Sequence, residues 1–140
     1  MEYSLKMNWA STYQCNSSIS NFSNYMDLEE KNLLFDTLER YTALKRLKLN
    51  LIETEIEDGI LARLSNMLSK CSFLEELTLR ISGNFISLEG FENLLKKLEK
   101  LPNLRKLVLR ARRIKSLQSK RPRVDSLIAE LRVAVKDVMF

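Results

Sequence analysis

Leucines in the middle of the chain recur in a six-residue phrase that returns at a fixed interval of thirty positions. The phrase occupies residues 44–49, 74–79 and 104–109, and each copy has leucine at its first, fourth and sixth positions. The alternation continues with one further apolar residue after each copy, at Leu51, Ile81 and Ala111. Apolar residues at every second position predict a β-strand with one buried face. A fixed period of this length predicts stacked structural repeats.

Between the phrases, apolar residues at helical spacing keep the same thirty-residue period. The equivalent positions form three columns: Leu34, Leu64, Leu94 and Val124; Leu38, Leu68, Leu98 and Ile128; and Tyr41, Cys71, Leu101 and Leu131. Asp27 and Glu30 have the spacing of a capping box, so we expect the first helix to begin there. The last helix is expected over about 123–138. The pattern therefore predicts four helices and three strands.

The L-x-x-L-x-L phrase followed by a helical stretch resembles the leucine-rich repeat. The long, helix-containing unit is similar to the repeats of ribonuclease inhibitor, and the resemblance covers about residues 27–138. It implies an α/β fold: a short leucine-rich-repeat solenoid with parallel strands on the concave side and helices on the convex side. Asn84 stands where the family often places an asparagine that bonds the backbone of the bend. The equivalent positions hold Thr54 and Ile114, so an asparagine ladder is not maintained.

The N-terminal part of the chain differs in composition from the rest. Residues 1–25 are rich in Ser, Asn and Thr and sustain neither a strand nor a helix period. Such a composition is typical of flexible segments, but five aromatic residues are scattered through it: Tyr3, Trp9, Tyr13, Phe22 and Tyr25. We therefore expect an N-terminal arm over 1–26 that is flexible or is ordered by a partner, and a repeat domain over 27–140.

Composition places the chain among ordinary globular proteins, with 45% hydrophobic and 29% charged residues. No apolar run is long enough for a transmembrane helix, and residues 1–10 lack the pattern of a signal peptide. The two cysteines, Cys15 and Cys71, are interpreted as reduced thiols. These features favour an intracellular, cytoplasmic protein without a membrane partner, and leave a cytoskeletal or nuclear location open.

The sequence lacks the residue types and motifs that are typical of catalytic sites. Histidine is absent from the whole chain, which removes the commonest general base and the commonest metal ligand. No Gly-rich phosphate loop or metal-ligand spacing occurs, so we expect no enzyme activity, no cofactor, no metal and no small-molecule substrate. The acidic residues Glu53, Glu55, Glu57 and Asp58 are interpreted as a turn that favours the start of the next helix.

Positive charge is concentrated near the C-terminal end. Residues 101–140 hold eleven basic and three acidic residues, a balance of +8, whereas the whole chain carries +5. Residues 105–123 hold nine basic residues and no acid. This basic segment could contact nucleic-acid phosphates, include a nuclear address at 120–123, bind an acidic protein, or be a solvated loop.

In the leucine-rich-repeat family, the side chains between the strand leucines point to the concave surface. The resemblance therefore implies four exposed columns in this chain: Arg46, Glu76 and Lys106; Lys48, Thr78 and Val108; Asn50, Arg80 and Arg110; and Ile52, Ser82 and Arg112. The candidate partner-binding residues are Arg46, Lys48, Arg80, Lys106, Arg110, Arg112 and Arg113.

Two functions from different classes follow, with a third possibility beside them. The first is a non-catalytic protein–protein interaction or structural subunit that docks an acidic protein partner within a multi-subunit assembly. It would use the basic concave face and the ends of the solenoid. The alternative is a nucleic-acid-associated module that uses the basic segment 105–123. A truncated relic of a longer array is the third possibility.

Overall fold

A parallel sheet whose strands follow the order of the sequence forms the centre of the fold. The computed structural model describes residues 18–21, 27–40 and 43–140. The strands β1 (Ser18–Asn21), β2 (Arg46–Asn50), β3 (Glu76–Arg80), β4 (Lys106–Arg110) and β5 (Asp137–Met139) lie in that order, and every neighbouring pair is parallel. The helices are α1 (Leu28–Glu39), α2 (Asp58–Ser69), α3 (Leu88–Glu99), α4 (Lys115–Gln118) and α5 (Arg121–Ala134).

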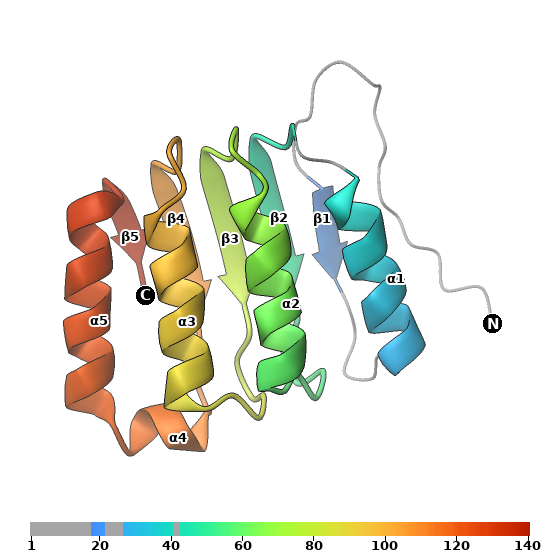
Figure 1. The fold of residues 1–140 in the computed structure, drawn as a ribbon. Coiled ribbons are helices and arrows are strands. Elements are labelled where there is room, and N and C mark those ends of the chain that lie inside the picture. Colours follow the sequence, from blue (N-terminus) through green and yellow to red (C-terminus); the bar gives the residue numbers. More distant parts are fainter. Residues whose placement is uncertain (1–17, 22–26, 41–42) are drawn as a thin grey trace.

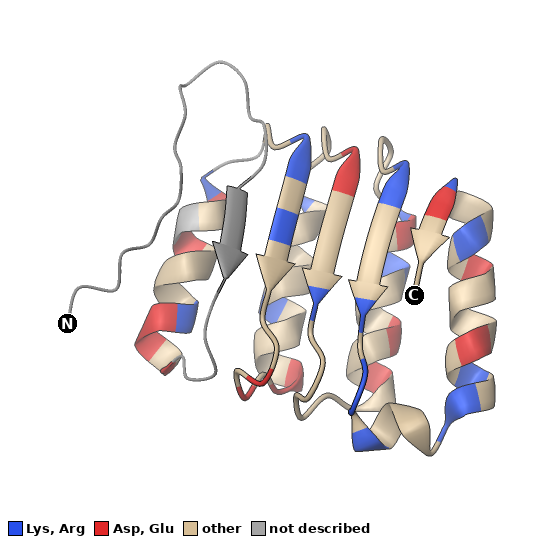
Figure 2. Cartoon of the chain, turned by 180° about the vertical axis from the view of Figure 1, so that it is seen from behind, with Lys and Arg blue, Asp and Glu red and all other residues tan. Residues whose placement is uncertain are grey.

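Helices cover one face of this sheet, and no helix of the described residues lies on the other, which we call the open face. Figure 1 shows α1, α2, α3 and α5 standing side by side on the covered face. The view from behind in Figure 2 shows the uncovered strands. The predicted α/β class, with parallel strands on one side and helices on the other, is confirmed.

The sheet register reproduces the thirty-residue period of the sequence. Leu47 pairs with Leu77, which pairs with Leu107, and the leucines two positions later pair in the same way. All six of these leucines are buried. The alternation that predicted three strands with one buried face is therefore confirmed for β2, β3 and β4.

The helical columns meet the strand leucines in one continuous core. Every member of the first two predicted columns is buried, as are Cys71, Leu101 and Leu131 of the third. Tyr41, the remaining member of the third column, lies outside the described residues. Burial raises the pKa of the Cys71 thiol, so this side chain stays protonated and packs as a small apolar residue.

Backbone amides at helix starts and bends are satisfied by the predicted side chains. At the start of α1, the Asp27 carboxylate accepts a hydrogen bond from the Glu30 amide at 2.8 Å. The Glu30 carboxylate accepts one from the Asp27 amide at 3.0 Å, which completes the capping box. Asn84 is buried in the bend after β3 and bonds the backbone of two successive bends, as expected.

The C-terminal end corrects the prediction of a helix over 123–138. Helix α5 ends at Ala134, because Val135 adopts an extended backbone with φ −112° and ψ 122°. Val135 and Val138 are β-branched and favour extended structure, and 137–139 form β5 beside β4. The structure also contains the short helix α4, which the pattern did not predict.

The N-terminal segment contains a strand where the composition gave no such signal. Ser18–Asn21 forms β1 and pairs with β2, with Ser18 opposite Leu47 and Ser20 opposite Leu49. The described part of the sheet therefore has five strands, whereas three were predicted. The other residues of the expected arm over 1–26 lie outside the described residues, as does Cys15, so the domain boundary stays a prediction.

Candidate functional site

The open face of the sheet carries the side chains that alternate with the buried leucines. The register places Arg46, Glu76 and Lys106 in one row across β2, β3 and β4. Lys48, Thr78 and Val108 form the next row, and Asn50, Arg80 and Arg110 the third. Three of the four predicted columns thus come together on one surface, and none of their residues is buried.

Charge in the first row is compensated between neighbouring strands. Arg46 lies 3.6 Å from Glu76, and Lys106 stands in register between Glu76 and Asp137 of β5. Figure 2 shows this row as alternating blue and red at the starts of the four strands. Arg46 and Lys106, which were predicted to bind a partner, are therefore flanked by acidic residues of this chain.

Basic residues without such compensation gather at the carboxyl ends of β3 and β4. Arg80 and Arg110 are in register, and Arg112 follows two positions later. We call these three residues the strand-end cluster. Within the described part of the chain, none of the three forms an ion pair with a carboxylate. Adjacent strands lie about 4.8 Å apart, so the Arg80 and Arg110 cations repel each other and favour an external anion. Figure 2 shows blue at both strand ends.

The fourth predicted column does not belong entirely to the exposed face. Ser82 is buried, and its hydroxyl oxygen accepts a hydrogen bond from the Arg112 amide at 2.9 Å. Its role is to hold two neighbouring bends together, which corrects the expectation that it faces a partner. Arg112 itself is exposed.

Arg113, another predicted partner-binding residue, is engaged by an acid two repeats away. Glu53, Gly83 and Arg113 occupy the same place in successive bends, and all have positive φ, at 53°, 70° and 56°. A Cβ atom on Gly83 would lie 2.6 Å from Cγ of Glu53, so glycine leaves the space through which the Glu53 side chain passes. The Glu53 carboxylate then reaches the Arg113 guanidinium at 2.7 Å.

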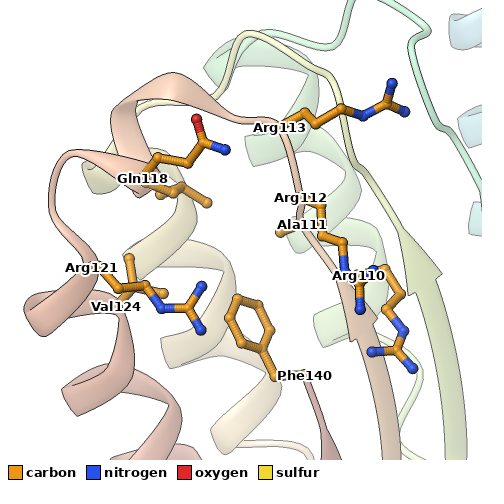
Figure 3. Close-up of a pocket in the computed structure, with 9 residues that line it drawn as sticks. Arg110, Ala111, Arg112, Arg113, Gln118, Arg121, Val124 and Phe140 are labelled. Carbon is orange, nitrogen blue, oxygen red and sulfur yellow. The ribbon is translucent and has the colours of Figure 1, made fainter.

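A cavity of about 460 Å³ lies beside the strand-end cluster, between the end of β4, helix α4 and the start of α5. Among the described residues its lining contains four arginines, Arg110, Arg112, Arg113 and Arg121, and no aspartate or glutamate. Apolar lining comes from Leu117, Val124 and Phe140. We call this cavity the arginine pocket. In Figure 3, Arg121 lies on one side of the Phe140 ring, Arg110 and Arg112 lie on the other, and Arg113 points away.

The sequence did not predict that Arg121 and Phe140 line the same cavity. Arg121 was counted in the basic segment, but Phe140 carried no expectation of a site. The structure joins them because α5 and β5 return the chain to β4, and the Arg121 guanidinium lies 5.7 Å from the centre of the Phe140 ring. A fourth copy of the strand phrase at residues 135–140, with valine and phenylalanine in place of leucine, was the available signal.

The basic segment 105–123 does not form one uncompensated surface. Four of its nine cations pair with carboxylates: Arg105 with Glu75 at 2.5 Å, Arg113 with Glu53 at 2.7 Å, Arg121 with Asp125 at 2.9 Å and Arg123 with Glu92 at 2.6 Å. The segment begins on the sheet and ends on α5, on the helical side of the molecule (Figure 1).

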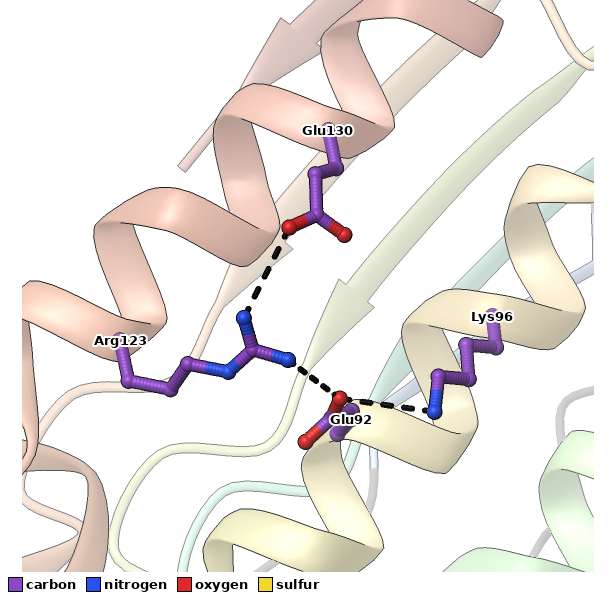
Figure 4. A network of polar contacts seen from close by, with 4 residues as sticks. All are labelled: Glu92, Lys96, Arg123 and Glu130. Atoms are coloured by element: carbon purple, nitrogen blue, oxygen red, sulfur yellow. Dashed lines mark hydrogen bonds and ion pairs between the residues drawn. The ribbon is translucent and has the colours of Figure 1, made fainter.

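The Arg123 pair belongs to a charge network between α3 and α5. Figure 4 shows Glu92 between Arg123 and Lys96, with Glu130 on the far side of Arg123. The hydrogen bond from Arg123 holds the pKa of the Glu92 carboxyl below its usual value, although partial desolvation opposes the shift. The same network reduces the charge that Arg123 can offer to a partner.

The acidic residues after β2 have structural roles where the structure records a contact for them. Besides the Glu53–Arg113 pair, the Asp58 carboxylate accepts a hydrogen bond from the Ser87 amide at 2.8 Å.

Within the described ranges, no cluster of three or more potential acidic, cysteine or histidine ligands could hold a metal ion. Nor is any helix of those ranges long and apolar enough to cross a membrane.

Comparison with known proteins gives one kind of information, a likeness of fold. Neither a protein-family model nor a curated protein matches the sequence. A solved structure of leiomodin-1 actin-binding site 2 is similar, with a TM-score of 0.59 and 18% sequence identity. The alignment covers 88% of this chain and 68% of that chain. At this identity the similarity concerns the arrangement of the elements and is compatible with a leucine-rich-repeat type of fold.

Proposed function

We propose that this chain is a leucine-rich-repeat solenoid of the long, ribonuclease-inhibitor-like kind that acts as a non-catalytic binding subunit in a larger assembly. It docks an acidic segment of a protein partner on the open face of its sheet. The contact is centred on the strand-end cluster of Arg80, Arg110 and Arg112. Lys48 is exposed on β2, two positions before the residue that pairs with Arg80, and it extends the same surface.

The observation that carries this proposal is the position of the cluster. Two arginines in register on adjacent strands repel each other, and a third follows in the next bend. A carboxylate-rich segment that crosses the strands would relieve this repulsion, and arginine binds carboxylates in a bidentate geometry. The open face of stacked repeats provides an extended surface for such a segment.

The likeness to leiomodin-1 actin-binding site 2 supports a protein partner in general terms. That domain is named for binding actin. A similar arrangement of strands and helices thus serves a protein–protein contact in another chain. Purified actin is therefore a useful second probe beside an acidic peptide.

Nucleic-acid binding through residues 105–123 is the weaker proposal. Four of the nine cations are paired with carboxylates, and the segment runs from the sheet to the helical side. A protein that follows a phosphate backbone instead needs a continuous basic groove or stripe. The unpaired cations of the segment therefore form no continuous stripe that a phosphate backbone could follow.

The test is titration of the 140-residue chain with a fluorescent Glu- and Asp-rich peptide, read by anisotropy. Reversal of the cluster in the triple variant Arg80→Glu, Arg110→Glu and Arg112→Glu should weaken binding by about tenfold or more, because three attractive contacts become repulsive. The matched control reverses three exposed lysines outside the cluster, Lys45, Lys115 and Lys136. The control changes the net charge equally and should retain most of the affinity.

Two results would contradict the proposal. Equal weakening in the cluster and control variants would mean that only net charge matters. Tighter binding to duplex or single-stranded nucleic acid than to the peptide, falling about tenfold or more with a modest rise in salt, would favour the alternative function.

A further inference from the structure

We propose that the arginine pocket binds the phosphate group of a phosphorylated aromatic side chain in the partner segment. The inference rests on the proposed function, because it names the chemical group that the pocket beside the strand-end cluster recognises. Arg110 and Arg112 belong to both surfaces. Arg121 lines the pocket alone, and Arg80 belongs to the cluster alone.

The charges of the pocket favour a dianion. Arg110, Arg112 and Arg121 come from the end of β4, the loop after it and the start of α5, and no aspartate or glutamate of the part of the chain that the structure describes lines the cavity. Figure 3 shows Arg110 and Arg112 together on one side of the Phe140 ring and Arg121 on its other side. A phosphomonoester carries about −1.5 to −2 charge at pH 7 and three acceptor oxygens. It can therefore accept hydrogen bonds from several guanidinium groups at once, which a single carboxylate does less well.

Two of the four lining arginines pair with carboxylates, and within the described residues Arg110 and Arg112 form no such pair. Asp125 pairs with Arg121 on the exposed side of α5, at 2.9 Å, and both side chains are more than half exposed. Glu53 pairs with Arg113, whose side chain points away from the cavity. The Arg110 guanidinium has a sulfur contact with Met139 at 3.5 Å rather than a carboxylate.

The apolar lining favours an aromatic carrier of the phosphate. Leu117 and Val124 are buried in the wall, and the Phe140 ring is held by Phe91 at a centroid distance of 6.0 Å. A cavity of about 460 Å³ exceeds the needs of a phosphate group and lies in the usual range of ligand pockets. An aromatic ring can pack against Phe140 in a tilted or offset arrangement while its phosphate meets the arginines.

The first experiment compares small probes by NMR titration of the ¹⁵N-labelled 140-residue chain. Phenyl phosphate should bind more tightly than inorganic phosphate, which lacks the ring, and more tightly than phenyl sulfate, which carries a single charge. Its affinity should rise between about pH 5 and pH 7 as the second phosphate proton dissociates. The chain has no histidine, so we assign this rise to the ligand.

Single substitutions then separate the pocket from the strand-end cluster. Arg121→Gln should weaken phenyl phosphate by about tenfold or more, the size expected for a lost charge-assisted hydrogen bond. It should leave the acidic peptide bound. Arg80→Gln should weaken binding of the acidic peptide and leave binding of phenyl phosphate unchanged. Arg113→Gln is the matched control, because Arg113 is likewise paired with a carboxylate but points away from the Phe140 ring; it should change phenyl phosphate binding by less than about twofold.

The source of the phosphate is tested with a phosphotyrosine peptide and a phosphoserine peptide of otherwise equal sequence. The first should bind more tightly, and Arg121→Gln should remove the difference. Equal affinity for phenyl phosphate and phenyl sulfate would overturn the proposal, as would equal losses in Arg121→Gln and Arg113→Gln. Preference for free phosphate would overturn the aromatic carrier. Each of these results leaves the acidic-peptide experiment unaffected, so the two proposals can fail separately.

Discussion

Asn84 offers a quantitative test of how the successive bends are held together. Its side-chain oxygen accepts hydrogen bonds from the amides of Thr54 and Ile56, at 3.1 and 3.0 Å. Its side-chain nitrogen donates to the carbonyls of Leu51 and Ile81, at 2.7 and 2.8 Å. Only 4% of the residue is exposed. Asn84→Ala therefore removes four hydrogen bonds, of which three link two neighbouring repeats.

The expected cost follows from the groups that lose their partner. The Leu51 carbonyl keeps a hydrogen bond from the Thr54 hydroxyl at 2.9 Å, so the loss falls on the Ile81 carbonyl and on the two amides. A buried amide without a partner is tolerated less well than a carbonyl, so the two amides dominate the cost. A buried donor without a partner costs about 1 to 3 kcal/mol, and two such donors cost about 2 to 6 kcal/mol. Water that enters the vacated space would reduce the loss toward the lower value. This is a large part of the roughly 5 to 15 kcal/mol that stabilises a typical domain.

Urea unfolding followed by circular dichroism measures the loss, provided that the slope of the transition is unchanged. Asn103→Ala is the matched control, because the exposed Asn103 side chain also joins neighbouring repeats, through one bond of 2.7 Å to the Ser72 carbonyl. Water can replace that bond, so the control should lose less than about 1 kcal/mol. Equal losses in the two variants would refute the argument that Asn84 holds the bends.

Two further substitutions test the core and the charge network. Leu77→Asp places a charge in the buried row of the central strand β3 and should abolish cooperative unfolding; a melting curve like that of the parent would show the register to be wrong. Glu92→Gln should destabilise the chain most at neutral pH, because the pKa of Glu92 is lowered in the folded state, first by the hydrogen bond from Arg123. That stabilisation is fully present above the unfolded pKa of about 4.3 and is lost as the pH falls through the folded value. A stability difference that stays constant from neutral to strongly acidic pH would contradict this account.

The repeat period carried most of the fold because leucine spacing reports burial directly. The three copies of the phrase that contain leucines at thirty-residue intervals form β2, β3 and β4, and the stretches between them form helices as predicted. β5 was missed because its phrase begins at Val135, thirty-one residues after Leu104, and uses valine and phenylalanine. β1 gave no signal because Ser18 and Ser20 stand in register with the strand leucines.

The candidate site was less accessible from the sequence than the fold. The period correctly placed Arg80 beside Arg110, since parallel neighbours thirty residues apart share a row. It could not show that Glu53 reaches across Gly83 to Arg113, because such a contact depends on side-chain paths through the bends. Nor could it show a pocket whose walls come from the end of β4, from α5 and from Phe140 beyond β5.

The central claim, that the strand-end cluster binds an acidic protein segment, is tested most directly by exchanging charges on both sides. The measurement compares the parent chain and the Arg80→Glu, Arg110→Glu, Arg112→Glu variant for binding to a Glu-rich peptide and to its Lys-rich counterpart. The account predicts that the parent prefers the Glu-rich peptide and that the variant prefers the Lys-rich one, because complementary charge at this place determines the partner. A variant that keeps the parent's preference would place the interface elsewhere and contradict the account.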